Sequence, residues 1–158
     1  TVLCEVYSKY SGKAVLNIPG AGAAGGIGGA LGGVLGASMV QGIQKVLDIS
    51  SLDSKLESCD IVITGEGRAD AQTLRGKVPV GVLEYVRAHT VPVHRPKVIL
   101  IAGQVSDRQQ ILNAGFDAVL QITPEGMPLS EALDPVTASA NITQSMQSYL
   151  QQRCSGEK

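Results

Sequence analysis

Three short runs of β-branched and aliphatic residues limit the folds that this chain can adopt, because each reads as a buried strand. They are Asp60–Thr64, Lys97–Ala102 and Ala118–Ile122. Helical patterns lie between and after them, and the expected helices start after Pro79, near Asp107 and at about Pro135. Strands that alternate with helices predict a mainly parallel sheet covered by helices on both faces. We therefore expect one α/β domain over residues 1–158.

The first third of the chain is less regular. Lys13–Ile18 reads as a further short buried strand. The loops after this strand, after Thr64 and after Ala102 would then share the carboxyl edge of the sheet, where ligands of such folds bind. Val40–Ile49 fits a strand or a helix, and Ser51 is expected to cap a helix that follows it.

Composition narrows the classes of partner. The chain has a net charge of −1 and five aromatic side chains, four Tyr and one Phe, so neither a basic surface nor a base-stacking platform for nucleic acid is expected. An odd number of cysteines without metal-ligand spacing is typical of free thiols in a reducing compartment. We therefore expect a cytoplasmic protein with a small-molecule ligand. The three cysteines are Cys4, Cys59 and Cys154.

A glycine-rich run follows Pro19, with nine glycines from Gly20 to Gly36. It lies in an uncharged stretch, Ala14–Gln44, that is long enough to span a bilayer. Glycine and alanine bury little apolar area, however, so insertion in a membrane is not expected. Small residues instead allow backbone N–H groups to approach a phosphate closely, and a following helix adds its positive end.

Two other interpretations of this run stay open. Gly20, Gly22 and Gly25 match the G-x-G-x-x-G spacing of dinucleotide-binding folds, with Asp48 as the nearest acidic residue downstream. This alternative predicts an oxidoreductase that binds NAD. The second interpretation is that the glycines serve only close packing of helices.

A second motif, Gly65–Lys77, places charged residues directly after a strand. Glu66 and Asp70 are suitable ligands for Mg²⁺, and either could accept a proton from a substrate hydroxyl. Arg68 suits bidentate binding of phosphate or carboxylate, and Lys77 adds a point charge. The alternative is a solvated surface loop with local ion pairs. The motif is not a Walker A loop, because no Ser or Thr follows Lys77.

These motifs together resemble the glycerate kinase family, type I. The resemblance rests on their order and spacing, and it covers residues from about 12 to 150. The segments that carry it are Pro19-Gly-Ala-Gly-Ala-Ala-Gly-Gly26, Asp60-Ile-Val-Ile-Thr-Gly-Glu-Gly-Arg68, Asp70, Gln72, Gly76-Lys-Val-Pro-Val-Gly81, Ile101-Ala-Gly103 and Gly115-Phe-Asp-Ala-Val119.

The resemblance implies a Rossmann-like three-layer sandwich of which this chain supplies the last strands and helices. An incomplete domain would expose apolar surface that favours association. The implied activity is phosphorylation of glycerate from ATP with Mg²⁺, and the chain alone is expected to be inactive. A non-catalytic domain that binds a ligand or a partner is a further alternative.

The resemblance also implies roles for individual residues. Catalysis is assigned to Asp70, Arg68 and Lys77, with Asp70 as the base-like residue, and metal binding to Glu66 and Asp70. The residues expected to bind substrate or phosphate are Gly20, Gly22, Gly25, Gly26, Gly65, Gly67 and Gln72.

Overall fold

The computed structural model describes residues 2–155, and the chain divides into two compact units, Thr1–Gly42 and Ile43–Lys158. The first unit is helical. It contains α1 (Val2–Ser11), a 3₁₀ turn (Val15–Asn17), a 3₁₀ segment (Ala23–Gly26), α2 (Ile27–Gly29) and a π-helical turn (Ala30–Val34). No helix within the described residues is both long and apolar enough to cross a membrane.

The second unit is an α/β structure that starts at the beginning of α3. Its helices are α3 (Gly42–Ile49), α4 (Leu52–Leu56), α5 (Val78–His89), α6 (Arg108–Asn113), α7 (Leu129–Ala132) and α8 (Pro135–Ser155), with a 3₁₀ turn at Pro92–His94. Its strands are β1 (Ile61–Ala69), β2 (Lys97–Val105) and β3 (Ala118–Gln121). The three predicted strands are thus confirmed, as are the three predicted helices.

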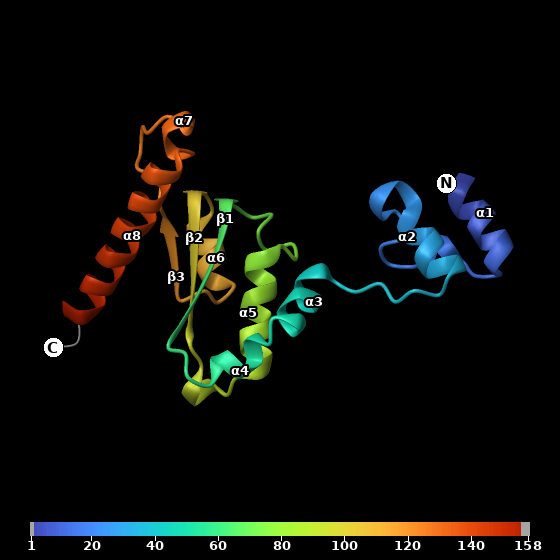
Figure 1. Ribbon diagram of the computed structural model, residues 1–158, viewed down its shortest axis with the longest axis horizontal. Helices are drawn as coiled ribbons and strands as arrows, with labels where there is room; N and C mark the ends of the chain where they lie inside the picture. The colour runs from blue at the N-terminus through green and yellow to red at the C-terminus, as the bar shows by residue number, and fades with distance from the viewer. Residues whose placement is uncertain (1, 156–158) are drawn as a thin grey trace. The chain divides into compact units, whose positions relative to one another are not determined.

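The sheet has the order β1-β2-β3, and both pairs of strands are parallel (Figure 1). Ile63 pairs with Ile99, and Ile99 pairs with Ala118, so these three residues share one face of the sheet. The predicted parallel sheet and the α/β class are confirmed. β1 is an edge strand with no second neighbour within residues 2–155.

One face of the sheet carries the core. Val62, Val98, Leu100 and Val119 are buried in a cluster with residues of α5 and with Ile111 of α6. The residues of α5 in this cluster are Val82, Leu83, Tyr85 and Val86. Burial raises the pKa of the Tyr85 phenol, and the nearby carboxylates of Asp53 and Asp48 raise it further.

The other face is covered less completely. Ile99 is fully buried there, but Ile63 beside it keeps 48% of its surface exposed. α8 lies near Leu120 and Ile122, and none of its residues is buried. This helix is rich in Gln, Ser and Thr, so it has few apolar side chains with which to close a second core.

The predicted strand at Lys13–Ile18 is wrong. This segment forms a 3₁₀ turn in which the Asn17 N–H donates to the Ala14 carbonyl at 3.0 Å and the Ile18 N–H donates to the Val15 carbonyl at 3.1 Å. Val15 is fully buried, whereas Leu16 is 62% exposed. Local hydrogen bonds satisfy the backbone here, so no sheet partner is needed.

The structure also answers three further expectations about local structure. Val40–Ile49, which fitted a strand or a helix, contains the helix α3 from Gly42. Ser51 precedes α4, but its backbone is left-handed with φ of 51° and its side chain makes no capping hydrogen bond. β1 and β2 also continue past Thr64 and Ala102, where the sequence suggested that loops begin.

Candidate functional site

The Gly65–Lys77 motif lies at the carboxyl end of β1, where the chain turns into α5 (Figure 1). The strand ends at Ala69, and Asp70 starts a tight turn in which the Thr73 N–H donates to the Asp70 carbonyl at 2.9 Å. Lys77 is extended and precedes α5, whose second residue is Pro79. Proline suits the first turn of a helix because the N–H that it lacks has no helical partner there. The turn therefore has a defined start and end.

Four of the five charged residues of the motif form two ion pairs. The Lys77 ammonium lies 3.5 Å from Glu66 Oε2, and Arg68 Nε lies 3.8 Å from Asp70 Oδ2. The carboxylates are the shielded partners, with side-chain exposures of 14% for Glu66 and 24% for Asp70. Arg68 is 66% exposed and Lys77 42%. Two shielded carboxylates beside two solvent-accessible cations form a polar centre at the sheet edge.

Thr73 also belongs to this centre, although it was not among the predicted site residues. Its hydroxyl donates to Glu66 Oε1 at 2.5 Å and accepts from the Asp70 N–H at 3.0 Å. Thr73 is fully buried. Its place three residues after Asp70 is the one sequence signal that could have identified it, because side chains at that spacing often close turns.

Asp107 was also missed, and it connects the end of β2 to the same turn. Its Oδ2 accepts a hydrogen bond from the Ala71 N–H at 3.3 Å, and the neighbouring Ser106 N–H donates to the Ala69 carbonyl at 2.9 Å. The backbone of Asp107 is left-handed, with φ of 52°. An Asp directly after a strand is a signal for such a contact, since Asp tolerates this conformation.

A cavity of about 300 Å³ lies at the carboxyl ends of the strands. Its lining includes Arg68, Gln104 and Thr123. Gln121 stabilises its wall, because the Val105 N–H donates to Gln121 Oε1 at 3.0 Å and Gln121 Nε2 donates to the Thr123 carbonyl at 3.0 Å. The cavity is thus mainly polar, and Arg68 contributes to both the cavity and the charged cluster.

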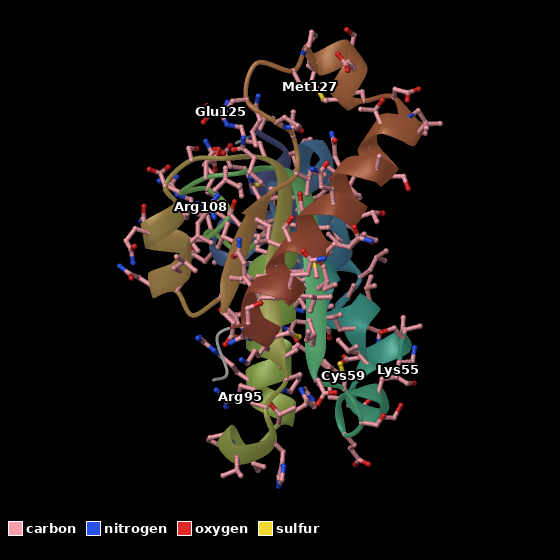
Figure 2. All side chains as sticks on the ribbon, turned by 90° about the vertical axis from the view of Figure 1, so that its left-hand side faces the viewer. Lys55, Cys59, Arg95, Arg108, Glu125 and Met127 are labelled. Atoms are coloured by element: carbon pink, nitrogen blue, oxygen red, sulfur yellow. The ribbon has the colours of Figure 1, made fainter. Side chains whose placement is uncertain are left out.

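Larger hollows lie elsewhere in the second unit. One of about 380 Å³ separates α8 from β3, and its only charged lining residue, Arg108, donates to the Val119 carbonyl. Another, of about 550 Å³, lies at the amino ends of β1 and β2 and includes Cys59 and Arg95. Figure 2 shows Cys59 and Arg95 at the end of the unit opposite to Glu125 and Met127, which line the 300 Å³ cavity. We place the candidate site at the carboxyl edge, where the charged cluster lies.

The remaining predicted residues of the motif lie next to the cluster. Gly65 and Gly67 belong to β1 rather than to a loop. A Cβ at Gly65 would lie 3.0 Å from the Ile101 side chain, so packing alone favours glycine there. The exposed Gln72 donates its N–H to Asp70 Oδ1 at 2.8 Å. This bond leaves Arg68 as the only protein partner of Asp70 Oδ2 within residues 2–155.

The predicted phosphate-binding glycines Gly20, Gly22, Gly25 and Gly26 belong to the first unit. Gly25 and Gly26 have φ of 68° and 101°, which favours glycine at both. Later glycines of the run serve close packing instead, since Gly29 and Gly33 each face the buried Val15. Packing therefore explains the second half of the run but not the first.

The dinucleotide fingerprint lacks its required context. G-x-G-x-x-G binds a pyrophosphate where it joins a strand to a helix, but Gly20 follows a 3₁₀ turn and not a strand. The expectation that this loop lies at the carboxyl edge of the sheet rested on a strand at Lys13–Ile18, and that segment is a 3₁₀ turn. The NAD alternative therefore has no structural support.

The donors at the charged cluster suit Mg²⁺ only together with other ligands. Within residues 2–155, no three His, Cys, Asp or Glu side chains are close enough to enclose a metal ion. Mg²⁺, however, is usually held by one or two carboxylates together with phosphate and water oxygens. Glu66 and Asp70, linked through Thr73, fit such an open site.

Comparison with known proteins gives one consistent family. The sequence profile of the glycerate kinase family matches residues 1–152. The chain is 46% identical over 119 residues to a glycerate kinase of Bacillus cereus, covering 75% of this chain and 30% of that protein. It is 41% identical over 129 residues to the glycerate 2-kinase of Escherichia coli, covering 81% of this chain and 32% of that protein. The chain thus spans about a third of the length of these relatives.

A solved structure agrees with the sequence comparisons. A protein of Salmonella typhimurium LT2, assigned as glycerate kinase 2, superimposes with a TM-score of 0.63 at 31% identity. The match covers 98% of this chain and 38% of that protein. Profile, relatives and fold lead to the same conclusion: this chain belongs to the glycerate kinase family.

Proposed function

We propose that this chain forms the phosphoryl-transfer part of a glycerate kinase, in which ATP donates its γ-phosphoryl group to a hydroxyl of glycerate. The observation that carries the proposal is the cluster of Glu66, Asp70 and Lys77 at the carboxyl edge of the sheet. Phosphoryl transfer needs mainly positioning and neutralisation of charge, and this cluster offers both cations and carboxylates. The family membership supports the same reaction.

The contacts of the two carboxylates support different roles for them. Both oxygens of Glu66 are engaged, one by Thr73 and one by Lys77. Asp70 Oδ2 has only the 3.8 Å contact with Arg68, which is weaker than a hydrogen bond. Asp70 is therefore the better candidate to accept a proton from the glycerate hydroxyl or to orient it.

Glu66 and Asp70 are also the proposed holders of Mg²⁺. When bound, the ion would neutralise charge on the phosphates. Lys77 and Arg68, both accessible to solvent, would stabilise the charge that develops on the transferred phosphoryl group. Gly65, Gly67 and Gln72 would line the phosphates from the strand and the turn. Gly20, Gly22, Gly25 and Gly26 would bind the ATP phosphates or glycerate from the first unit.

The test uses this chain in two forms. One is the 158-residue chain itself, and the other is a chimera in which it replaces the matching third of the Bacillus subtilis glycerate kinase, a relative with 39% identity over 131 residues. Release of ADP is measured with and without glycerate, ATP and Mg²⁺. We expect glycerate-dependent turnover from the chimera, none from the chain alone, and none after chelation of Mg²⁺.

Lys77→Ala in the chimera tests the charged cluster. Loss of a group that stabilises transition-state charge typically lowers kcat by about a hundredfold, and we expect a loss of that order. Arg75→Ala is the matched control, because Arg75 is an exposed cation of the same turn that makes no ion pair within the described residues. Equal activity of the two variants would remove Lys77 from the proposed mechanism. Near-normal turnover of Asp70→Asn would likewise remove Asp70 as the base.

A non-catalytic role is the alternative outcome. A chimera that folds and binds ATP but shows no turnover would support a domain that only binds a ligand or a partner. Circular dichroism and calorimetric titration with ATP separate this result from misfolding.

A further inference from the structure

Thr73 is a buried polar residue, and the groups that surround it belong to the proposed site. Only two polar side chains of the described residues are classed as buried, Thr64 and Thr73, and Thr73 has no exposed surface. A buried hydroxyl is costly unless its hydrogen-bonding capacity is used. The partners of Thr73 therefore show what the residue does.

The direction of its hydrogen bonds follows from their chemistry. The Asp70 N–H can only donate, so Thr73 Oγ1 accepts at this 3.0 Å contact. The one hydroxyl proton is then free for Glu66 Oε1, 2.5 Å away. Hydrogen bonds from hydroxyl to carboxylate are short and strong, and this distance lies in their range. Thr73 thus holds Glu66 directly.

The same residue holds the turn that presents Asp70. Its own N–H donates to the Asp70 carbonyl at 2.9 Å, and its side chain accepts from the Asp70 N–H. Both backbone groups of Asp70 are therefore bound by Thr73. Lys77 contacts the other oxygen of Glu66, so this carboxylate is held at both ends.

We propose that Thr73 is the positioning residue of this site, whose hydroxyl fixes the Glu66 carboxylate on β1 relative to the Asp70 turn. The inference rests on the proposed function for its kinetic consequence, but its structural part is independent of the reaction. Misplacement of reacting groups by an ångström can lower a rate by about a hundredfold. Loss of the hydroxyl should therefore reduce turnover without removing any group that contacts substrate.

The test compares Thr73→Val, which keeps the shape but loses the hydroxyl, with Thr73→Ser, which keeps the hydroxyl. In the chimera we expect kcat to fall about ten- to a hundredfold for the Val variant and by less than about threefold for the Ser variant. Thr90→Val is the control for loss of a hydroxyl bond in general. The Thr90 hydroxyl donates to the Val86 carbonyl at 2.6 Å near the end of α5. The kcat of the Thr90→Val chimera should stay unchanged.

A second readout does not depend on turnover. Hydrogen exchange of the Asp70 amide is measured by NMR in the 158-residue chain, because Thr73 Oγ1 accepts this proton. Exchange should accelerate at least about tenfold in Thr73→Val and stay near the original rate in Thr73→Ser. In the unmutated chain, the Thr73 hydroxyl proton should be visible in slow exchange. If the Val variant does not fold, the Ser variant and this hydroxyl signal decide.

The results separate the two proposals. An inactive unmutated chimera would contradict the proposed function. Three results would each overturn the role of Thr73. They are an unchanged exchange rate of the Asp70 amide in Thr73→Val, an equal loss of kcat in the Ser and Val variants, and a Thr73 hydroxyl proton in fast exchange.

Discussion

Gly103→Ala should destabilise the sheet at a point where two strands come unusually close. A Cβ at position 103 would lie 2.7 Å from the Gly67 carbonyl oxygen, whereas ordinary van der Waals contact starts near 3.4 Å. The obstructing atom belongs to the backbone of β1, so no side-chain rotation can relieve the contact. β1 and β2 would have to separate beside the pair formed by Arg68 and Gln104.

The expected magnitude follows from similar overpacked positions, where an added methyl group costs about 1–3 kcal/mol. For a chain of this size, each kcal/mol lowers the midpoint of thermal unfolding by about 2–4 °C, so we expect a decrease of about 2–12 °C. Urea unfolding followed by circular dichroism gives the free energy, and a differential scanning calorimeter gives the midpoint.

Gly67→Ala is a matched control on the facing strand. A Cβ there would meet no atom within 4 Å, and Gly67 does not have the positive φ that would disfavour alanine. This substitution should be neutral or stabilise by up to about 1 kcal/mol, because it restricts the unfolded chain. Equal stability of the two variants would refute the argument that the Gly67 carbonyl requires glycine at position 103.

Two further substitutions test other parts of the second unit. Gly81→Ala should lower the free energy of unfolding by up to about 2 kcal/mol. The reason is that a Cβ 2.6 Å from the Ile43 side chain costs more than the gain in helix propensity of about 1 kcal/mol. An additional Ile43→Ala should reduce this loss, and urea denaturation of the single and double variants measures it. The pKa of Asp134 lies below its ordinary value of 3.8, because the Thr137 N–H and hydroxyl donate to its carboxylate at the start of α8. The contribution of the Asp134 cap to stability should therefore be present above pH 4 and be lost as the pH falls through the lowered pKa. Thr137→Ala should raise the titration midpoint of Asp134, measured by NMR, only partway, since the backbone N–H remains.

The sheet could be predicted because its strands are buried on at least one face and rich in β-branched residues. The same apolar pattern predicted a strand at Lys13–Ile18 that is not there, because an apolar run does not indicate whether a partner strand exists. The length of β1 could not be predicted either. Glycines such as Gly65 and Gly67 usually weaken strands, but β1 extends through both, because Gly65 pairs with Ile101 and the pairing with β2 resumes at Arg68.

The candidate site could be predicted in its charges but not in its connections. Charged residues directly after a strand indicated Glu66, Arg68, Asp70 and Lys77, and the ion pairs confirm that they lie together in two pairs. The roles of Thr73 and Asp107 depend on the exact direction of a turn and on a loop 36 residues away. Such contacts arise from tertiary structure, which spacing along the chain does not report.

The single-sided pairing of β1 has a consequence for handling the protein. Backbone N–H and C=O groups along an edge strand can pair with a strand of another molecule. Ile61, Val62 and Ile63 form an uncharged stretch of this edge, and charges within an edge strand are what usually prevent such stacking. Solutions of the chain should therefore stay monodisperse when dilute and scatter light increasingly as concentration rises.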